Sequence, residues 1–154
     1  MKKTTQCYLE KDGKFLMLYR NRKKNDMNEG KWIAVGGKLE AGETPEEANA
    51  REVFEETGIR LNSAVFHGIA EFRNTEYEPE DMYLYSSDDF EIEPGYVPEC
   101  DEGELAWIPR EEIWTLPMWE GDRAFLEPIL NGECGLEIRL SYEGDRLIGV
   151  ERNS

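Results

Sequence analysis

The stretch Gly37–Ile59, GKLEAGETPEEANAREVFEETGI, decides the fold of this chain. It follows the apolar run Trp32–Val35 through a pair of glycines, so we expect a strand that leads into a flexible loop. The sequence TPEE, which begins at Thr44, is the signature of a capping box with proline at the first helical position. The pattern therefore predicts a helix over Pro45–Thr57, ended by Gly58 in a left-handed conformation.

This helix is predicted to carry two unlike faces. At about 100° per residue, Ala50, Val53 and Phe54 share one face, which we expect to pack on a core. Like charges at spacings of three and four residues cost about 0.2–0.5 kcal/mol per pair, so an all-acidic face needs a cause. Either it is simply solvated, or it binds a hard divalent cation, because Mg²⁺ and Mn²⁺ prefer carboxylate oxygen. The acidic face consists of Glu52, Glu55 and Glu56.

The same stretch resembles the Nudix box, GX5EX7REUXEEXGU, at every specified position. The resemblance implies a Nudix hydrolase, an enzyme that cleaves a nucleoside diphosphate linked to another group. It implies an α/β/α sandwich, with a mixed β-sheet between helices, and Mg²⁺ as cofactor, with Mn²⁺ possible. It also implies an ion pair between Glu43 and Arg51 that ties the loop to the helix. The metal ligands it implies are Glu52, Glu55, Glu56 and the carbonyl of Gly37 or its neighbour Gly36.

Composition narrows the class of partner. At 154 residues, the sequence predicts one domain over residues 1–154, and 34% charged with 39% hydrophobic residues is typical of a globular protein. The net charge of −16 argues against a nucleic-acid polymer or an anionic membrane as partner. The expected partner is a small-molecule nucleotide, which is itself an anion. The metal must then neutralise the site, helped by Lys38 and by a basic cluster that contains Arg20, Arg22, Lys23 and Lys24.

Cysteine usage indicates the compartment. Cys7, Cys100 and Cys134 are odd in number and widely spaced, which is typical of free thiols in a reducing environment. The sequence shows neither a signal-peptide pattern nor an apolar run of about 18 residues. We therefore expect a cytoplasmic protein, either a monomer or a homodimer.

Alternation of apolar and polar residues predicts a strand-rich chain around the box. Asp12-Gly13 is a strong hairpin signal. His67 lies in a predicted strand, where a lone histidine is more often packed than catalytic. The strands are expected at Gln6–Lys11, Lys14–Arg20, Trp32–Val35, Ser63–Arg73, Asp81–Phe90, Glu104–Pro109, Gly135–Tyr142 and Arg146–Glu151.

The segments between the later strands are predicted to be loops and helical turns. Asn21–Lys31 reads as a connector, from which Lys23 or Lys24 could alternatively reach the substrate phosphates. Glu91–Gly103 is an acidic loop rich in proline and glycine, and Arg110–Trp114 forms a helical turn. A second helix is expected over Pro117–Asn131, kinked or broken early by Pro128.

Two further site elements follow from position. Glu102 and Glu104 are candidates for an extra metal ligand, and in Nudix proteins a glutamate just before the tryptophan-containing strand has this role. Counting back from Trp107 favours Glu102. The stretch that contains Trp119 and Asp122 is similar to the base-recognition segment of MutT-like oxidised-purine sanitisers. A tryptophan that stacks on a purine and an acid that bonds its edge would suit this role, although a core position is the alternative.

The sequence departs from that group at two positions. Animal-type sanitisers carry an asparagine where this chain has Ile33, and a second aspartate where it has Gly121. We therefore expect a Mg²⁺-dependent hydrolysis of a nucleoside triphosphate to the monophosphate and pyrophosphate, with 8-oxo-dGTP or a related purine as substrate. A dinucleoside polyphosphate hydrolase, for which Tyr77 has the expected position, is the alternative. ADP-ribose is less favoured, and a catalytically dead nucleotide-sensing module or a plain cation-binding protein would be other classes of function.

Overall fold

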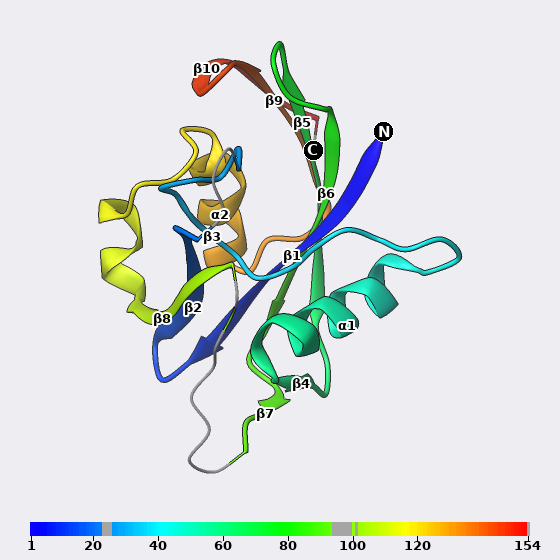
Figure 1. Cartoon of the computed structure of the whole chain (residues 1–154), viewed down its shortest axis with the longest axis vertical. Coiled ribbons are helices and arrows are strands. Elements are labelled where there is room, and N and C mark those ends of the chain that lie inside the picture. The colour runs from blue at the N-terminus through cyan, green and yellow to red at the C-terminus, as the bar shows by residue number, and fades with distance from the viewer. Residues whose placement is uncertain (23–25, 94–99, 101, 154) are drawn as a thin grey trace.

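The computed structural model describes residues 1–22, 26–93, 100 and 102–153. Within these residues the chain is rich in strands, with two α-helices and one 3₁₀ turn (Figure 1). In chain order the elements are β1 (Lys2–Lys11), β2 (Lys14–Arg20), β3 (Trp32–Ile33), α1 (Pro45–Thr57), β4 (Arg60–Leu61), β5 (Val65–Asn74), β6 (Glu80–Ser87), β7 (Phe90–Glu91), β8 (Gly103–Pro109), η1 (Arg110–Thr115), α2 (Asp122–Leu130), β9 (Leu136–Glu143) and β10 (Arg146–Arg152).

The main sheet is mixed, with the strand order β10-β9-β5-β6-β1-β2-β3 and β8 paired to β2. The pairs β1–β6 and β5–β9 are parallel, and the other neighbours are antiparallel. β1 pairs with β2 only next to the predicted turn, at Glu10–Phe15 and Lys11–Lys14. Farther back along β1, bridges to Val35 and Lys38 bring the glycine segment alongside the strand. The sheet therefore delivers this segment to the middle of the molecule.

The two helices cover opposite faces of the sheet, which gives the expected α/β/α sandwich. Alternate residues of β1 enter two different cores, because successive side chains of a strand point to opposite faces. Tyr8 joins the cluster that contains Phe125 of α2, whereas Leu9 joins the cluster that contains Val53 of α1. Figure 1 accordingly shows α1 and α2 on either side of β1.

Helix α1 begins and ends as the sequence predicts. The Glu47 N–H donates to Thr44 Oγ1 over 3.2 Å, and the Thr44 N–H donates to Glu47 Oε1 over 2.9 Å, which completes the capping box. At the other end Gly58 adopts φ 76°, and its N–H donates to the carbonyl of Phe54. These contacts fix the direction in which the acidic residues of the helix project.

The predicted apolar face of α1 is only partly right. Val53 is fully buried, but Ala50 is exposed, and Phe54 is 43% exposed beneath the guanidinium of Arg60. The buried stripe follows the i, i+4, i+8 spacing of Asn49, Val53 and Thr57 instead. The Thr57 hydroxyl donates to the Val53 carbonyl within the helix, so this polar side chain is satisfied when buried, which a purely apolar pattern does not reveal.

The second helix is shorter than predicted. Residues 117–119 are not helical, because the Pro117 carbonyl accepts the Trp32 N–H and Trp119 packs into the core. Helix α2 starts at Asp122 and continues through Pro128 to end two residues later. The expected early break at Pro128 is therefore wrong, whereas the alternative, a kink, stays a prediction. The short pair β4–β7 was not predicted, and most of the expected loop Glu91–Gly103 lies outside the described residues.

Candidate active site

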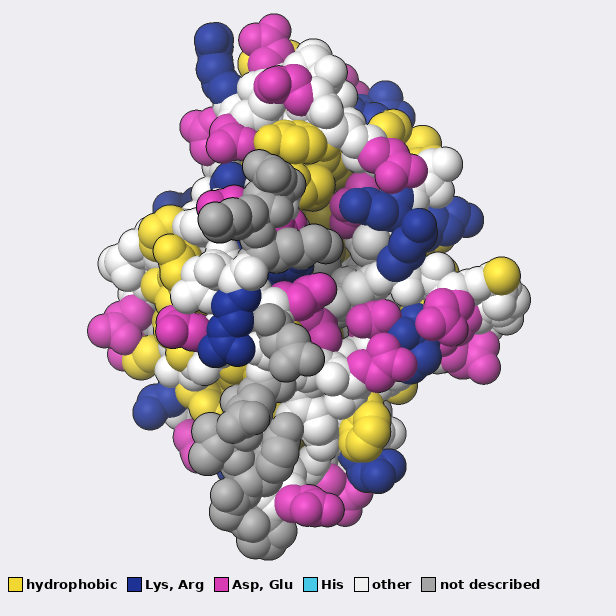
Figure 2. Space-filling view, in the orientation of Figure 1, with side chains coloured by type: hydrophobic (Ala, Val, Ile, Leu, Met, Phe, Trp, Pro, Cys, Tyr) yellow, Lys and Arg dark blue, Asp and Glu magenta, His cyan; other side chains and the backbone are white. Residues whose placement is uncertain are grey.

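A cavity of about 890 Å³ brings together most of the residues expected to act. It is bordered by β1, the glycine segment before α1, the acidic face of α1 and the segment before α2. On the face drawn in Figure 2, acidic side chains are interspersed with lysine and arginine, so the negative charge on this face is divided among smaller patches. Of the predicted site residues, the cavity is lined by Gly37, Lys38, Glu52, Glu55, Glu56, Glu102, Trp119 and Asp122.

One end of the cavity is acidic and centred on Glu56. Its Oε1 accepts the Gly36 N–H over 2.6 Å, so the glycine segment holds the carboxyl in place. Burial, with smaller contributions from Glu102 and Glu52, raises the pKa of Glu56 to about 8. Ligand atoms of Glu56, Cys100 and Glu102 all lie within 4.8 Å of one another. Two carboxyls and a thiol at this spacing could surround a metal ion.

Gly37 makes room for a second carboxylate. A Cβ atom on Gly37 would lie 2.2 Å from Glu52 Oε2, so only glycine leaves space for this side chain. The Gly37 carbonyl accepts the Thr5 N–H over 2.8 Å and is thus engaged with β1. Gly36 and Gly37 both line the cavity, so the metal-ligating carbonyl expected from one of them stays a prediction. The oxygen-rich donor set at this end fits a hard divalent cation.

Arg51 connects the acidic residues behind the cavity wall. Its guanidinium binds Glu43 through two nitrogens, at 2.7 and 2.9 Å, and donates to the Lys38 carbonyl. The same guanidinium reaches Glu52 at 2.6 Å and Glu55 at 3.1 Å. The bond to Arg51 lowers the pKa of Glu43 to about 2. This ion pair links the loop to α1 as the family resemblance implies.

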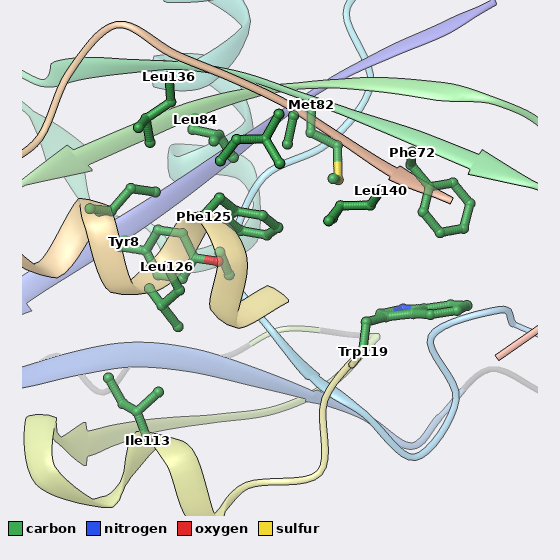
Figure 3. Packing of buried hydrophobic residues seen from close by; sticks show 14 of the residues in the cluster. Tyr8, Phe72, Met82, Leu84, Ile113, Trp119, Phe125, Leu126, Leu136 and Leu140 are labelled. Carbon is green, nitrogen blue, oxygen red and sulfur yellow. The ribbon is translucent and has the colours of Figure 1, made fainter. Parts of the chain in front are cut away.

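The other end of the cavity is aromatic. Trp119 is 5% exposed and packs edge to face with Phe72 and Tyr142, at centroid distances of 5.3 and 5.0 Å. Figure 3 shows Trp119 and Phe72 together at one end of the core cluster, away from Leu136. The ammonium of Lys31 lies 4.3 Å from the centroid of the Trp119 ring. Trp119 is thus both a core residue and a wall of the cavity.

Asp122 lies beside this aromatic wall, in the first turn of α2. Burial raises the pKa of its carboxyl to about 8, and the positive charge of Lys31 opposes the shift. At neutral pH the carboxyl is therefore mostly protonated, so it can both donate and accept a hydrogen bond. A neutral acid next to a flat aromatic ring suits recognition of a heterocyclic base.

The remaining predicted residues lie elsewhere. Glu104 of β8 pairs with Tyr19 of β2 and is not part of the cavity wall. Glu102, by contrast, lines the cavity and lies 3.3 Å from the guanidinium of Arg20. Lys23 and Lys24 lie outside the described residues. His67 is buried away from the cavity, with one ring nitrogen 2.6 Å from the Glu133 carbonyl and the other 2.6 Å from the Ser86 hydroxyl, as expected of a packed histidine.

Several cavity residues were not anticipated. Cys100 was treated only as a free thiol, yet its Sγ lies 3.8 Å from Glu56 Oε2. Asn28 was assigned to a connector, yet its Oδ1 accepts the indole N–H of Trp119 over 2.8 Å. Neither position has a neighbouring motif that marks it, because its partner is distant in sequence. Other lining residues missed by sequence reasoning are Thr4, Gln6, Asp26, Glu80 and Met82.

Comparison with known proteins agrees with this geometry. A family model described as NUDIX domain matches residues 4–128. The chain is 31% identical over 146 residues to the Nudix hydrolase YvcI of Bacillus subtilis, a match that covers 92% of this chain and 87% of the relative. It is 35% identical over 101 residues to an oxidized purine nucleoside triphosphate hydrolase of Danio rerio, covering 65% of this chain and 63% of the relative.

A solved structure extends the likeness to the whole fold. The crystal structure of a MutT protein from Bacillus halodurans matches with a TM-score of 0.87 and 27% identity, covering 99% of this chain and 98% of the other. No helix among the described residues is long and apolar enough to cross a membrane. The chain belongs to the NUDIX domain family and is a MutT-like Nudix hydrolase.

Proposed function

We propose that this enzyme hydrolyses a purine nucleoside triphosphate, with 8-oxo-dGTP as the leading candidate, to the monophosphate and pyrophosphate with Mg²⁺ as cofactor. The observation that carries the proposal is one cavity with a carboxylate cluster at one end and an aromatic wall with a neutral acid at the other. A nucleotide placed along it would have its phosphates near Glu56 and its base near Trp119. The relative from Danio rerio, named as an oxidized purine nucleoside triphosphate hydrolase, supports this choice.

The chain's own residues divide the work. Nudix hydrolases generally use divalent metals, and here Glu52, Glu55, Glu56, Glu102 and the carbonyl of Gly36 or Gly37 would hold the cation. A bound Mg²⁺ supplies phosphate charge neutralisation and an activated water near neutral pH.

Cations on the cavity wall assist with the phosphates. Lys38 and Arg20 line the cavity and add positive charge for the substrate phosphates, with Lys23 a further candidate from sequence. Arg20 is held by ion pairs to Asp26 at 2.8 Å and Glu102 at 3.3 Å, so its position near the acidic end is fixed. Arg51 and Glu43 keep Glu52 oriented.

The test is pyrophosphate release from dGTP and 8-oxo-dGTP, with Mg²⁺ and with chelator. We expect metal-dependent release, with the larger kcat/KM on 8-oxo-dGTP, and its loss in Glu56→Gln. That variant keeps the size of the side chain and its contact with Gly36, so a loss reports on metal binding and not on the fold. Full activity in Glu56→Gln, or none in the wild-type enzyme with Mg²⁺, would sink the proposal.

A dinucleoside polyphosphate is the second candidate. Tyr77 packs edge to face with Trp119 at a centroid distance of 6.2 Å and is 36% exposed, so it could extend the aromatic wall toward a second base. Diadenosine polyphosphates belong in the same assay. A higher kcat/KM on them than on either triphosphate would transfer the assignment to this class.

A further inference from the structure

The segment from Asp26 to Lys31 is held against the cavity by contacts with the end of β2. Asp26 binds Arg20 through an ion pair of 2.8 Å, and its Oδ1 accepts the Asn28 N–H over 3.2 Å. The Gly30 N–H donates to the Arg20 carbonyl over 2.8 Å, and the Lys31 N–H donates to the Asn28 carbonyl over 2.9 Å. The turn that carries Asn28 is therefore held at both ends, so its side chain is positioned before any ligand binds.

The contact with Trp119 also fixes which way the Asn28 amide faces. An indole N–H can only donate a hydrogen bond, so the amide atom 2.8 Å away must be the oxygen. The NH₂ group then points away from the indole. Among the described residues, none accepts a hydrogen bond from Asn28 Nδ2, and Asn28 lines the cavity together with Asp122. The Asn28 NH₂ group thus remains available to donate a hydrogen bond to a ligand in the cavity.

A hydrogen-bond donor at this position distinguishes purines with a keto oxygen from purines with an amino group. A guanine-type base has a keto oxygen where adenine has an amino group, and 8-oxoguanine carries a second keto oxygen. Asp122 cannot make this distinction alone, because a protonated carboxyl both donates and accepts. An amide that cannot turn around donates a hydrogen bond to a keto oxygen but leaves an amino group facing another donor, which is a costly mismatch.

We propose that Asn28 is a specificity-determining residue, which selects purines with a keto oxygen at the recognised edge over aminopurines. The inference rests on the proposed function, because that proposal places the base of the substrate near Trp119. Base preference is, however, measurable by binding alone, so the two can fail separately.

The test measures affinity for dGMP, 8-oxo-dGMP and dAMP by calorimetry. Asn28→Asp keeps the side-chain size and an oxygen for the Trp119 N–H, but presents an acceptor to the cavity. Asn28→Leu removes the donors without adding charge. Asn153→Asp is the matched control, because this exposed residue adds the same charge outside the cavity wall. Thermal unfolding of each variant establishes that it is folded.

We expect the wild-type protein to prefer dGMP or 8-oxo-dGMP over dAMP. Asn28→Asp and Asn28→Leu should each reduce that preference by about 10- to 100-fold, whereas Asn153→Asp should leave it unchanged. A wild-type protein without keto preference, or a preference that survives both Asn28 variants, overturns the inference. If the wild-type protein releases no pyrophosphate from any triphosphate, the proposed function fails, and the binding ratios still decide the role of Asn28.

Discussion

Replacing Gly37 with alanine should impair catalysis while leaving the fold intact. The new Cβ would lie 2.2 Å from Glu52 Oε2 and 2.4 Å from Glu52 Cδ, far inside the contact distance of about 3.5 Å. Because the carboxylate ends a flexible side chain, it can swing aside. We expect the free energy of unfolding to change by less than about 1 kcal/mol. Displacing this group should lower kcat/KM by about 10- to 100-fold, the loss usual when metal ligands are misoriented.

Gly36→Ala is the matched control, because we expect this substitution, unlike Gly37→Ala, to destabilise the fold. A Cβ there would lie 1.9 Å from the backbone oxygen of Thr5, and Gly36 has φ 153°, which side chains rarely adopt. Backbone strain of about 1–3 kcal/mol and overpacking of about 1–3 kcal/mol should together destabilise the protein by about 2–6 kcal/mol. Such a loss lowers the Tm by roughly 4–24 °C for a chain of this size.

Urea unfolding and Mg²⁺-dependent turnover of both variants provide the assay. Mn²⁺ binding, followed by electron paramagnetic resonance, adds a measurement that does not depend on activity. Wild-type kcat/KM and Mn²⁺ affinity in Gly37→Ala would refute the reasoning, because Glu52 would then not need its present position. A larger loss of stability in Gly37→Ala than in Gly36→Ala would refute it as well.

Three further predictions concern stability. Asp122 has its pKa raised from 3.8 to about 8, so the native state holds a proton that the unfolded state has lost between these values, and stability falls as pH rises. The free energy of unfolding of Asp122→Asn, measured in urea, should therefore rise relative to that of the wild type by about 1.4 kcal/mol per pH unit between pH 5 and 8. The same pH dependence in both proteins would contradict this. Thr44→Ala removes a hydrogen bond of the capping box and should cost about 1 kcal/mol, lowering the Tm by roughly 2–4 °C, and an unchanged Tm would count against the cap. Val53→Ala should lower the free energy of unfolding in urea by about 2 kcal/mol, because Val53 is fully buried, and Phe54→Ala should lower it by less than half of that. The reverse order would favour the apolar face expected from the sequence.

Local signals carried the parts of the fold that the sequence predicted correctly. The ends of α1 depend on Thr44, Glu47 and Gly58, which lie within the element or next to it. The β1–β2 turn depends on Asp12-Gly13 in the same way. A short stretch of sequence contains the whole cause of each of these features, so pattern reasoning could find them.

Features that depend on distant partners could not be predicted from such patterns. The non-helical segment at residues 117–119 is stabilised by the Trp32 N–H, and Phe54 is displaced from the core because Asn49 and Thr57 take the buried stripe. Asn28 is a cavity residue only because Trp119, 91 positions later, donates to it. The box identified the acidic end of the cavity and the later motif identified Trp119 and Asp122 at the other end, whereas Asn28 needed the structure.

The parallel pairing of β1 with β6 has a consequence during synthesis. Thr4 and Glu80, which meet in this pair, are 76 positions apart. A ribosome that adds roughly 5–20 residues per second needs about 4–15 s to cover that interval. Throughout it, among the described elements, β1 has backbone pairing only with β2 near the turn and with the segment around Val35 and Lys38. A strand that ends up in the middle of the sheet therefore leaves the ribosome with an open edge, and aggregation of the nascent chain is most probable before residue 87 emerges.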